Sequence, residues 1–167
     1  MYQSVLKFWF EEVDSTKWFV KDERFDALVC ERFAEIHRQA NLGELYTWRS
    51  SAEGRLAEII VLDQFSRNMY RDTPQAFASD ALALVLAQEA ISVKSDQNLS
   101  PTEQSFLYMP FIHSESIEIH KLAVKLYSQP GLERNLDFEL RHQDIIDRFG
   151  RYPHRNEILA RESTEEE

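Results

Sequence analysis

The segment Ser50–Asn68, with the sequence SSAEGRLAEIIVLDQFSRN, carries the clearest structural information in the chain. Glu53 follows Ser50 by three positions, which is the pattern of a capping box, so a helix is expected to start at Ser50. Apolar residues then recur at helical spacing, and the only charged residue within Leu56–Leu62 is Glu58. A helix with so little charge is expected to be buried on most sides, with other elements packed around it.

The rest of the chain repeats this helical spacing, and no useful length of it alternates as a strand does. Only four glycines and five prolines interrupt the chain. The strongest start signal is Ser100, because Pro101 takes the first helical position and Glu103 closes a capping box. Further helices are expected over residues 4–12, 22–42, 79–93, 114–128 and 136–149, with a kink or stop at Pro110 and a short turn after Pro153.

These segments predict an all-α fold of about seven helices packed as antiparallel hairpins, since consecutive helices with short connections pack in that way. The 167 residues suit a single all-helical domain over 1–167, and a chain of this length buries about 70% of the surface that it exposes when unfolded. Cys30 is the one cysteine, so no internal disulfide is possible. With no signal-peptide pattern and no long apolar run, we expect a cytoplasmic protein without a membrane span.

Charge limits the possible partners of the protein. The formal net charge is −10, which argues against general nucleic-acid binding because that function needs a basic surface. Residues 141–161 are the exception, with five arginines against three acidic residues. A local basic patch on an acidic protein favours a small anion over a polyanion.

Asp63 occupies a position where the helical pattern calls for an apolar side chain. Leu56, Ile59 and Ile60 share one stripe, and Asp63 and Arg67 continue it. A buried carboxylate without a partner is costly, so Asp63 requires one. Arg67 lies one turn later, in the acid-then-base order that favours an ion pair.

Two later segments repeat this anomaly. Glu115 interrupts one expected apolar stripe, directly after His113, and His142 interrupts another. The two stripes are Ile112, Glu115, Ile119, Leu122 and Leu126, and Phe138, His142, Ile145, Ile146 and Phe149. If the apolar faces meet, Asp63, Glu115 and His142 lie close together and, with His113, form the candidate catalytic group.

The candidate ligand-binding residues surround this group. The loop that follows the last long helix carries two arginines, a histidine and an amide within a short stretch. With two residues of the central segment, they form a candidate rim of Arg67, Asn68, Arg151, His154, Arg155 and Asn156. A structural interpretation stays open: an Asp63–Arg67 ion pair, with His142 bonded to a backbone carbonyl, explains the pattern without a ligand.

The chain resembles the bacterial family known as domain of unknown function 924. The matching stretches are residues 5–10, 18–19, 62–68 with Arg71, 76–80, 109–115 and 142–156, so the resemblance covers essentially the whole chain. It implies an all-helical fold similar to the tetratricopeptide-like superfamily of stacked helical hairpins. It implies no activity.

Three hypotheses about function remain open, and the first is a site for a small anionic metabolite. A phosphate or carboxylate would be held by forked hydrogen bonds from Arg67, Arg151 and Arg155. His142 or His113 would act as acid or base, and hydrolysis is the least specific reaction of this kind. Glu115 or Asp63 would orient the histidine. The sequence leaves open whether the protein is an enzyme.

The other two hypotheses need no such anion. His113, Glu115 and His142, with Asp63 as a further ligand, are of the types that bind zinc, iron or manganese, although their spacing matches no known metal-binding motif. Alternatively, the helical hairpins form a scaffold that binds a peptide or protein partner, and the polar core is purely structural. The sequence does not fix the oligomeric state, and a homodimer is compatible with it.

Overall fold

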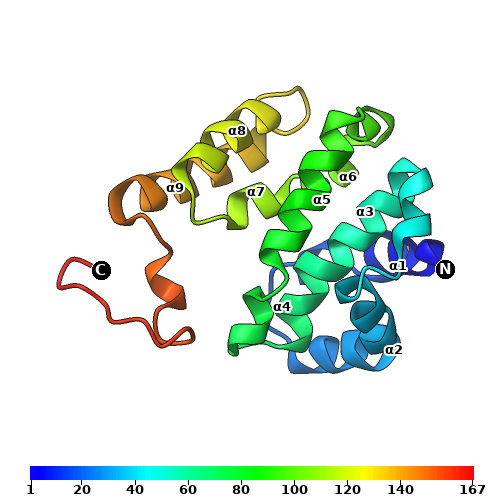
Figure 1. Ribbon diagram of the computed structural model, residues 1–167, viewed down its shortest axis with the longest axis horizontal. Coiled ribbons are helices and arrows are strands. Elements are labelled where there is room, and N and C mark those ends of the chain that lie inside the picture. Colours follow the sequence, from blue (N-terminus) through cyan, green and yellow to red (C-terminus); the bar gives the residue numbers. More distant parts are fainter.

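The segment with the clearest sequence signal forms one continuous helix at the centre of the molecule (Figure 1). α3 covers Ala52–Ile60, a π-helical turn covers Val61–Phe65, and α4 covers Ser66–Met69. The computed structural model describes residues 1–167, which form helices, turns and loops without a strand. The prediction of an all-α fold is therefore confirmed.

The other helices follow the predicted ranges closely. They are α1 (Tyr2–Lys7) with a π-helical turn at Phe8–Glu12, α2 (Glu23–Asn41), α5 (Asp80–Ser92), α6 (Pro101–Leu107), α7 (Met109–His113), α8 (Ile117–Tyr127) and α9 (Glu133–Phe149). Short 3-10 turns lie at Ser15–Lys17, Tyr46–Ser50, Pro74–Phe77, Ser95–Asn98 and Pro153–Arg155. With α3–α4 counted as one helix, and α6–α7 as one helix kinked beside Pro110, the chain has the seven helical units that the sequence predicts.

The start of α3 differs from the prediction by one residue. Ser51, and not Ser50, is the cap, because its Oγ accepts the backbone N–H of Gly54 at 3.1 Å. Ser50 ends the preceding 3-10 turn, which brings the carbonyl oxygen of Trp48 so close that a Cβ on Gly54 would lie 2.0 Å from it. The capping box at Ser100 is present as predicted.

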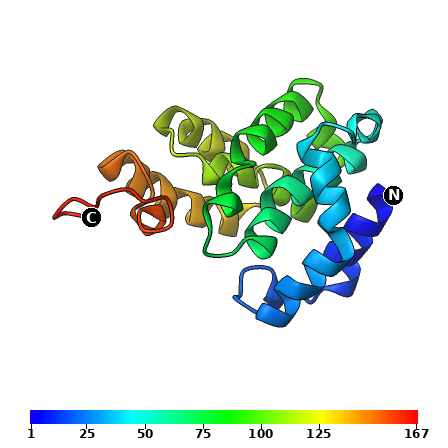
Figure 2. The same cartoon turned by 60° about the horizontal axis from the view of Figure 1, so that its bottom comes forward.

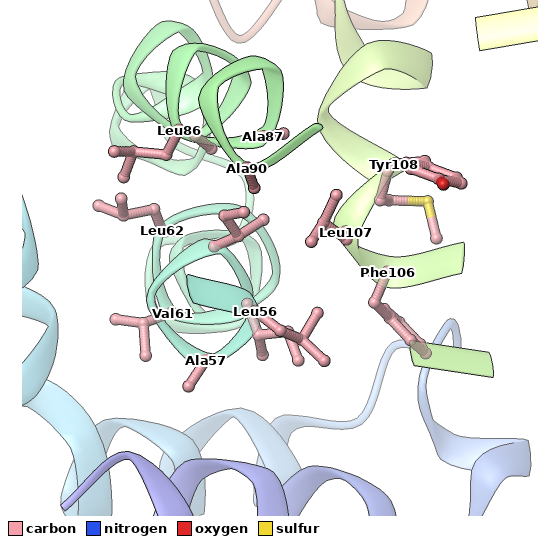
Figure 3. Packing of buried hydrophobic residues seen from close by; sticks show 14 of the residues in the cluster. Leu56, Ala57, Val61, Leu62, Leu86, Ala87, Ala90, Phe106, Leu107 and Tyr108 are labelled. Carbon is pink, nitrogen blue, oxygen red and sulfur yellow. The ribbon is translucent and has the colours of Figure 1, made fainter. Parts of the chain in front are cut away.

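Helices on several sides bury α3. α1 and α5 pack against α3, and α2 packs against the π-helical turn and α4 (Figures 1 and 2). In Figure 3, Leu62 of the π-helical turn faces Leu86 of α5, and Ala87 and Ala90 of α5 lie on the side toward Leu107 of α6. The expected burial on most sides is therefore confirmed.

At the other end of the molecule, α8 and α9 form an antiparallel hairpin, and the segment after α9 turns back beneath it (Figure 1). The expected buried stripes of these helices are only partly correct, because Ile146 of α9 is buried as predicted but other predicted positions are not. α8 buries His120, Ala123 and Tyr127, whereas the predicted Leu122 is 43% exposed. α9 likewise buries Glu139 and leaves Phe138 47% exposed. His120 of α8 and Glu139 of α9 are buried on these faces because their side chains bond to each other.

No helix combines the length and apolar character needed to cross a bilayer.

Candidate functional site

Asp63 and His113 form a hydrogen-bonded pair at the junction of the central helix and α7. Asp63 lies in the middle of the π-helical turn, a type of helical irregularity that often occurs at functional sites. His113 is the last residue of α7, and its Nδ1 lies 2.7 Å from Asp63 Oδ1. The Asp63 side chain is 1% exposed, and that of His113 is 18% exposed. The pair is therefore anchored at the buried carboxylate and accessible at the imidazole.

Arg67 links this pair to α5. Its Nη1 and Nη2 donate to the two carboxylate oxygens of Asp80 at 2.8 and 3.0 Å. Nη1 also lies 3.0 Å from the backbone oxygen of Asp63 and 3.4 Å from its Oδ1. The expected Asp63–Arg67 pair is thus present, but the first partner of Arg67 is Asp80, which the sequence analysis did not select.

Arg155 reaches the same group from the C-terminal 3-10 turn. Its Nη2 donates to the backbone oxygen of His113 at 2.9 Å, and its Nη1 lies 3.6 Å from Asp80 Oδ2. The guanidinium lies over the ring of Phe77, 4.5 Å from the centroid. The Arg155 side chain is only 7% exposed, and its buried Nε has no hydrogen-bond partner. Two arginines and two aspartates thus surround His113.

Burial keeps the imidazole of His113 neutral near pH 7. Burial and the neighbouring Arg67 lower the pKa of His113, although Asp63 acts in the opposite direction. Burial alone would raise the pKa of Asp63, but His113 and Arg67 outweigh it, and the pKa lies below its usual range. The ionised Asp63 carboxylate therefore accepts the hydrogen bond from Nδ1–H, and the lone pair of His113 stays on Nε2.

His113 lines two hollows in the protein surface. The larger has a volume of about 420 Å³ and is lined by Phe77, Asp80, Glu115, Arg155 and Leu159, among others. The smaller has a volume of about 170 Å³ and lies between the loop at Trp18–Val20, the end of the central helix and α9. Nε2 of His113 makes no hydrogen bond within the chain and is not one of the buried side-chain atoms that lack a partner. It therefore keeps contact with solvent.

Glu115 does not join Asp63 and His142, which corrects the expected three-residue group. Its carboxylate accepts two hydrogen bonds from Arg161, at 2.7 and 2.9 Å, and one from the backbone N–H of Tyr152 at 2.7 Å. Burial tends to raise the pKa of Glu115, but the hydrogen bonds from Arg161 and Tyr152 outweigh it and hold the pKa low. Glu115 fastens the segment after α9 and contributes only to the wall of the larger hollow.

His142 is separate from the His113 pair and has a local partner. Its Nδ1 donates to the backbone oxygen of Phe138 at 2.8 Å, one turn earlier in α9. This is the bond to a carbonyl that the structural interpretation proposed for His142. His154, in the loop after α9, is exposed, and its ring lies 5.4 Å from that of Tyr152.

Three other candidate ligand-binding residues form hydrogen bonds or ion pairs with other residues of the chain. Arg151 forms a two-pronged pair with the Glu167 carboxylate at 2.7 Å, and Asn156 donates to the same carboxylate at 3.2 Å. Both therefore hold the C-terminal segment and are not on the walls of the two hollows. Asn68 donates to Asp26 of α2 at 2.8 Å and lines the smaller hollow.

The expected metal ligands do not converge. No group of three or more His, Cys, Asp or Glu side chains is placed so that it could hold a metal ion. Of the proposed set, only His113 and Asp63 are in contact, because Glu115 and His142 bond to other partners. The geometry therefore gives no support to the metal-site hypothesis.

The sequence analysis missed a second buried pair. Nδ1 of His120 lies 2.7 Å from Glu139 Oε1, its Nε2 lies 2.7 Å from the backbone oxygen of Ser114, and both side chains of the pair are fully buried. The available signal was the helical spacing of His120, Ala123 and Tyr127. We assigned the neighbouring apolar stripe instead. This pair joins α8 to α9 and lines neither hollow.

Fold and site together define an all-α protein with an Asp–His pair at the wall of two hollows. The chain belongs to the family described as bacterial protein of unknown function (DUF924), whose model matches residues 5–167, as the resemblance predicted. It is similar in structure to a protein of unknown function from Agrobacterium tumefaciens, with a TM-score of 0.94 and 41% sequence identity over 99% of this chain and 93% of that one. No curated protein matches the chain.

Proposed function

We propose that the protein binds a small anionic metabolite beside His113 and that the Asp63–His113 pair acts there as a general base, in the manner of a hydrolase. The observation that carries this proposal is the 2.7 Å contact between His113 Nδ1 and the buried Asp63 carboxylate, with Nε2 accessible. A carboxylate that holds one ring nitrogen fixes both the tautomer and the orientation of an imidazole. The opposite nitrogen is then ready to accept a proton.

In this reaction Nε2 of His113 takes a proton from a water molecule as the water oxygen attacks an electrophilic carbonyl or phosphoryl centre. The imidazolium then returns the proton to the leaving group, so that proton and electron pair are both accounted for. Asp63 stays ionised and stabilises the transient imidazolium. The lowered pKa of His113 supports this role, because a base must be neutral at the working pH.

Arg67 and Arg155 supply the positive charge next to His113. Each is at least 80% buried, and Asp80 pairs with Arg67. A buried guanidinium that is already oriented loses little conformational freedom when it binds an anion. Asp63 and Asp80 offset the two arginines, so we expect recognition of one small anionic group and not of a highly charged ligand.

A thermal-shift screen against common metabolites, phosphorylated compounds, carboxylates and divalent metal ions tests the binding. A ligand at one hundred times its dissociation constant adds about 2.7 kcal/mol to stability. For this chain length the midpoint should rise by roughly 5–10 °C. The shift should vanish in Arg67→Gln and persist in Arg134→Gln, an exposed arginine of α9. Turnover of any hit should fall by about 10²–10⁴-fold in His113→Gln.

A second candidate is a helical scaffold for a peptide or protein partner, with a structural polar core. The observation that favours it is the internal pairing of so many candidate residues, such as Glu115 with Arg161 and Arg151 with Glu167. Silence across the whole panel, together with variants that are merely less stable, would favour this candidate over the first.

A further inference from the structure

The smaller hollow is made by parts of the chain that are far apart in sequence. The loop Trp18–Val20 forms one wall, and the second is formed by Arg67 at the end of the central helix and Arg71 in the turn that follows it. Phe138 of α9 and His113 of α7 complete it. It is therefore a product of tertiary packing, and His113 connects it to the proposed acid–base site.

The charge of its lining distinguishes this hollow from the larger one. Two guanidinium groups, those of Arg67 and Arg71, line it, and no carboxylate does. In the larger hollow, by contrast, Asp80 and Glu115 accompany Arg155. An anion in the larger hollow would meet carboxylates at its walls, whereas the carboxylates that pair with Arg67 and Arg71, those of Asp80 and Asp26, are not part of the lining of the smaller one. The smaller hollow is thus the better place for a negative group.

Arg71 is held ready for such a group. Its Nε and Nη2 donate to the two oxygens of Asp26 at 2.5 and 2.8 Å, and Asn68 donates to the same carboxylate at 2.8 Å. The remaining nitrogen, Nη1, makes no hydrogen bond within the chain. Because Asp26 fixes the guanidinium plane, binding through Nη1 costs little side-chain entropy.

The other half of the hollow is apolar and open to solvent. Phe19 is 69% exposed, Val20 is 52% exposed and Phe138 is 47% exposed. Trp18 anchors the loop, since its Nε1 donates to the backbone oxygen of Trp9 at 2.9 Å and its ring packs edge-on against Phe106 at 4.8 Å. Large apolar side chains held at the mouth of a hollow are typical of a ligand-binding surface.

We propose that the smaller hollow binds a small monocarboxylate with an apolar body. The carboxylate bonds to Arg71 and Arg67, and the short aliphatic or aromatic body covers Phe19 and Phe138. The volume of about 170 Å³ is below the range of about 300–1,000 Å³ that accommodates drug-sized ligands, so the body has few carbons. This inference rests on the proposed function in one respect: the acid bound in the smaller hollow lies next to His113, the proposed base.

Isothermal titration calorimetry of the full chain with four probes tests the inference. Phenylacetate and hexanoate carry both the charge and the apolar body, acetate lacks the body, and 2-phenylethanol lacks the charge. We expect the first two to bind at least tenfold more tightly than the last two, because charge-assisted hydrogen bonds and apolar burial each contribute about this much.

Substitutions inside and outside the smaller hollow test whether phenylacetate binds there. Arg71→Gln should weaken phenylacetate binding by about tenfold or more, because it removes the charged donor. Phe19→Ala, at an exposed position where folding is not at risk, should weaken it by about fivefold, whereas acetate binding should be unaffected. Arg134→Gln should change neither, because Arg134 is exposed and outside the hollow.

The inference would be overturned by the absence of heat with phenylacetate or hexanoate up to about 10 mM, by equal affinity for acetate, or by binding that is insensitive to Arg71→Gln and Phe19→Ala. Binding that is lost in Arg155→Gln and kept in Arg71→Gln also overturns it, but leaves intact the proposed function beside His113. Conversely, binding with the expected sensitivities that leaves the His113 imidazole resonance unshifted in NMR spectra supports the inference and contradicts the proposed function.

Discussion

The substitution Asp63→Asn tests the central pair of the candidate site. Asp63 accepts hydrogen bonds from His113 and Gln64 at 2.7 Å, with Arg67 at 3.4 Å, and its side chain is 1% exposed. An asparagine keeps the shape but offers one acceptor oxygen in place of two. Its NH2 group therefore faces at least one of these donors and cannot accept a hydrogen bond from it. One buried donor therefore loses its acceptor, and the others lose a charged one.

The magnitude follows from these contacts. A hydrogen bond to a charged group contributes about 1.5–3 kcal/mol. The larger penalty of an uncompensated buried charge does not arise, because Arg67 retains Asp80 at 2.8 Å. We expect the free energy of unfolding to fall by about 2–3 kcal/mol. The thermal midpoint should then fall by roughly 4–12 °C for a chain of this length.

A double-mutant cycle with His113→Gln measures the coupling within the pair. Urea unfolding followed by circular dichroism gives the four stabilities, and the two substitutions should be non-additive by about 1.5 kcal/mol or more. Asp137→Asn, at an exposed position of α9, should stay within about 0.5 kcal/mol of the wild type. Additivity of Asp63→Asn and His113→Gln within about 0.5 kcal/mol would refute the assignment of a coupled pair.

Three further predictions concern Gly54, Glu115 and the pH dependence of stability. Gly54→Ala should destabilise it by about 1–3 kcal/mol in thermal unfolding, because the new Cβ would lie 2.0 Å from the Trp48 carbonyl oxygen. Glu115→Gln should speed proteolysis of the segment after α9 while helical circular dichroism is unchanged, since the carboxylate accepts two hydrogen bonds from partly exposed Arg161. Stability should fall as pH drops below about 6.5, because burial lowers the folded-state pKa of His113 and the unfolded state then binds more protons. In His113→Gln this loss should be smaller.

Each of these predictions has a matched control. Gly43→Asn should be nearly neutral, because no atom lies within 4 Å of the added Cβ and asparagine tolerates the φ of +70°. Glu118→Gln, at an exposed position of α8, should leave proteolysis unchanged. His142→Gln should retain the acid-dependent loss of stability that His113→Gln reduces. A pH profile that is identical in wild type and His113→Gln would contradict the assignment to His113.

Local interactions explain how much of the fold the sequence predicted. The capping box at Ser100 and the helix stop at Gly150, whose φ is +68°, depend on residues a few positions apart. The apolar face of α3 also follows from spacing within one helix, and Leu56, Ile59 and Ile60 are fully buried. Such signals are strong because helical hydrogen bonds and caps act within one or two turns.

The phase of α8 and α9 required information that periodicity lacks. His120 is buried because Glu139, nineteen residues later, accepts its hydrogen bond. An alternative, apolar face that contains Leu122 was equally compatible with helical spacing, yet the Leu122 residue is 43% exposed. Spacing states which residues share a face, and only the partner helix determines which face is buried.

In the candidate site, too, spacing within one helix predicted some features and packing between helices decided the others. The sequence alone placed Asp63 and Arg67 one turn apart on a buried helix and identified His113 and Arg155 as unusual polar residues. Their meeting around Asp80 depends on contacts between residues far apart in the sequence, such as Asp63 with His113, 50 positions later, and Asp80 with Arg155. The pairing of Glu115 with Arg161 is a long-range contact of the same kind. Such contacts exist only once α5, α7 and the C-terminal turn have packed together, because hydrogen bonds and ion pairs act over a few ångströms, and packing alone sets those distances.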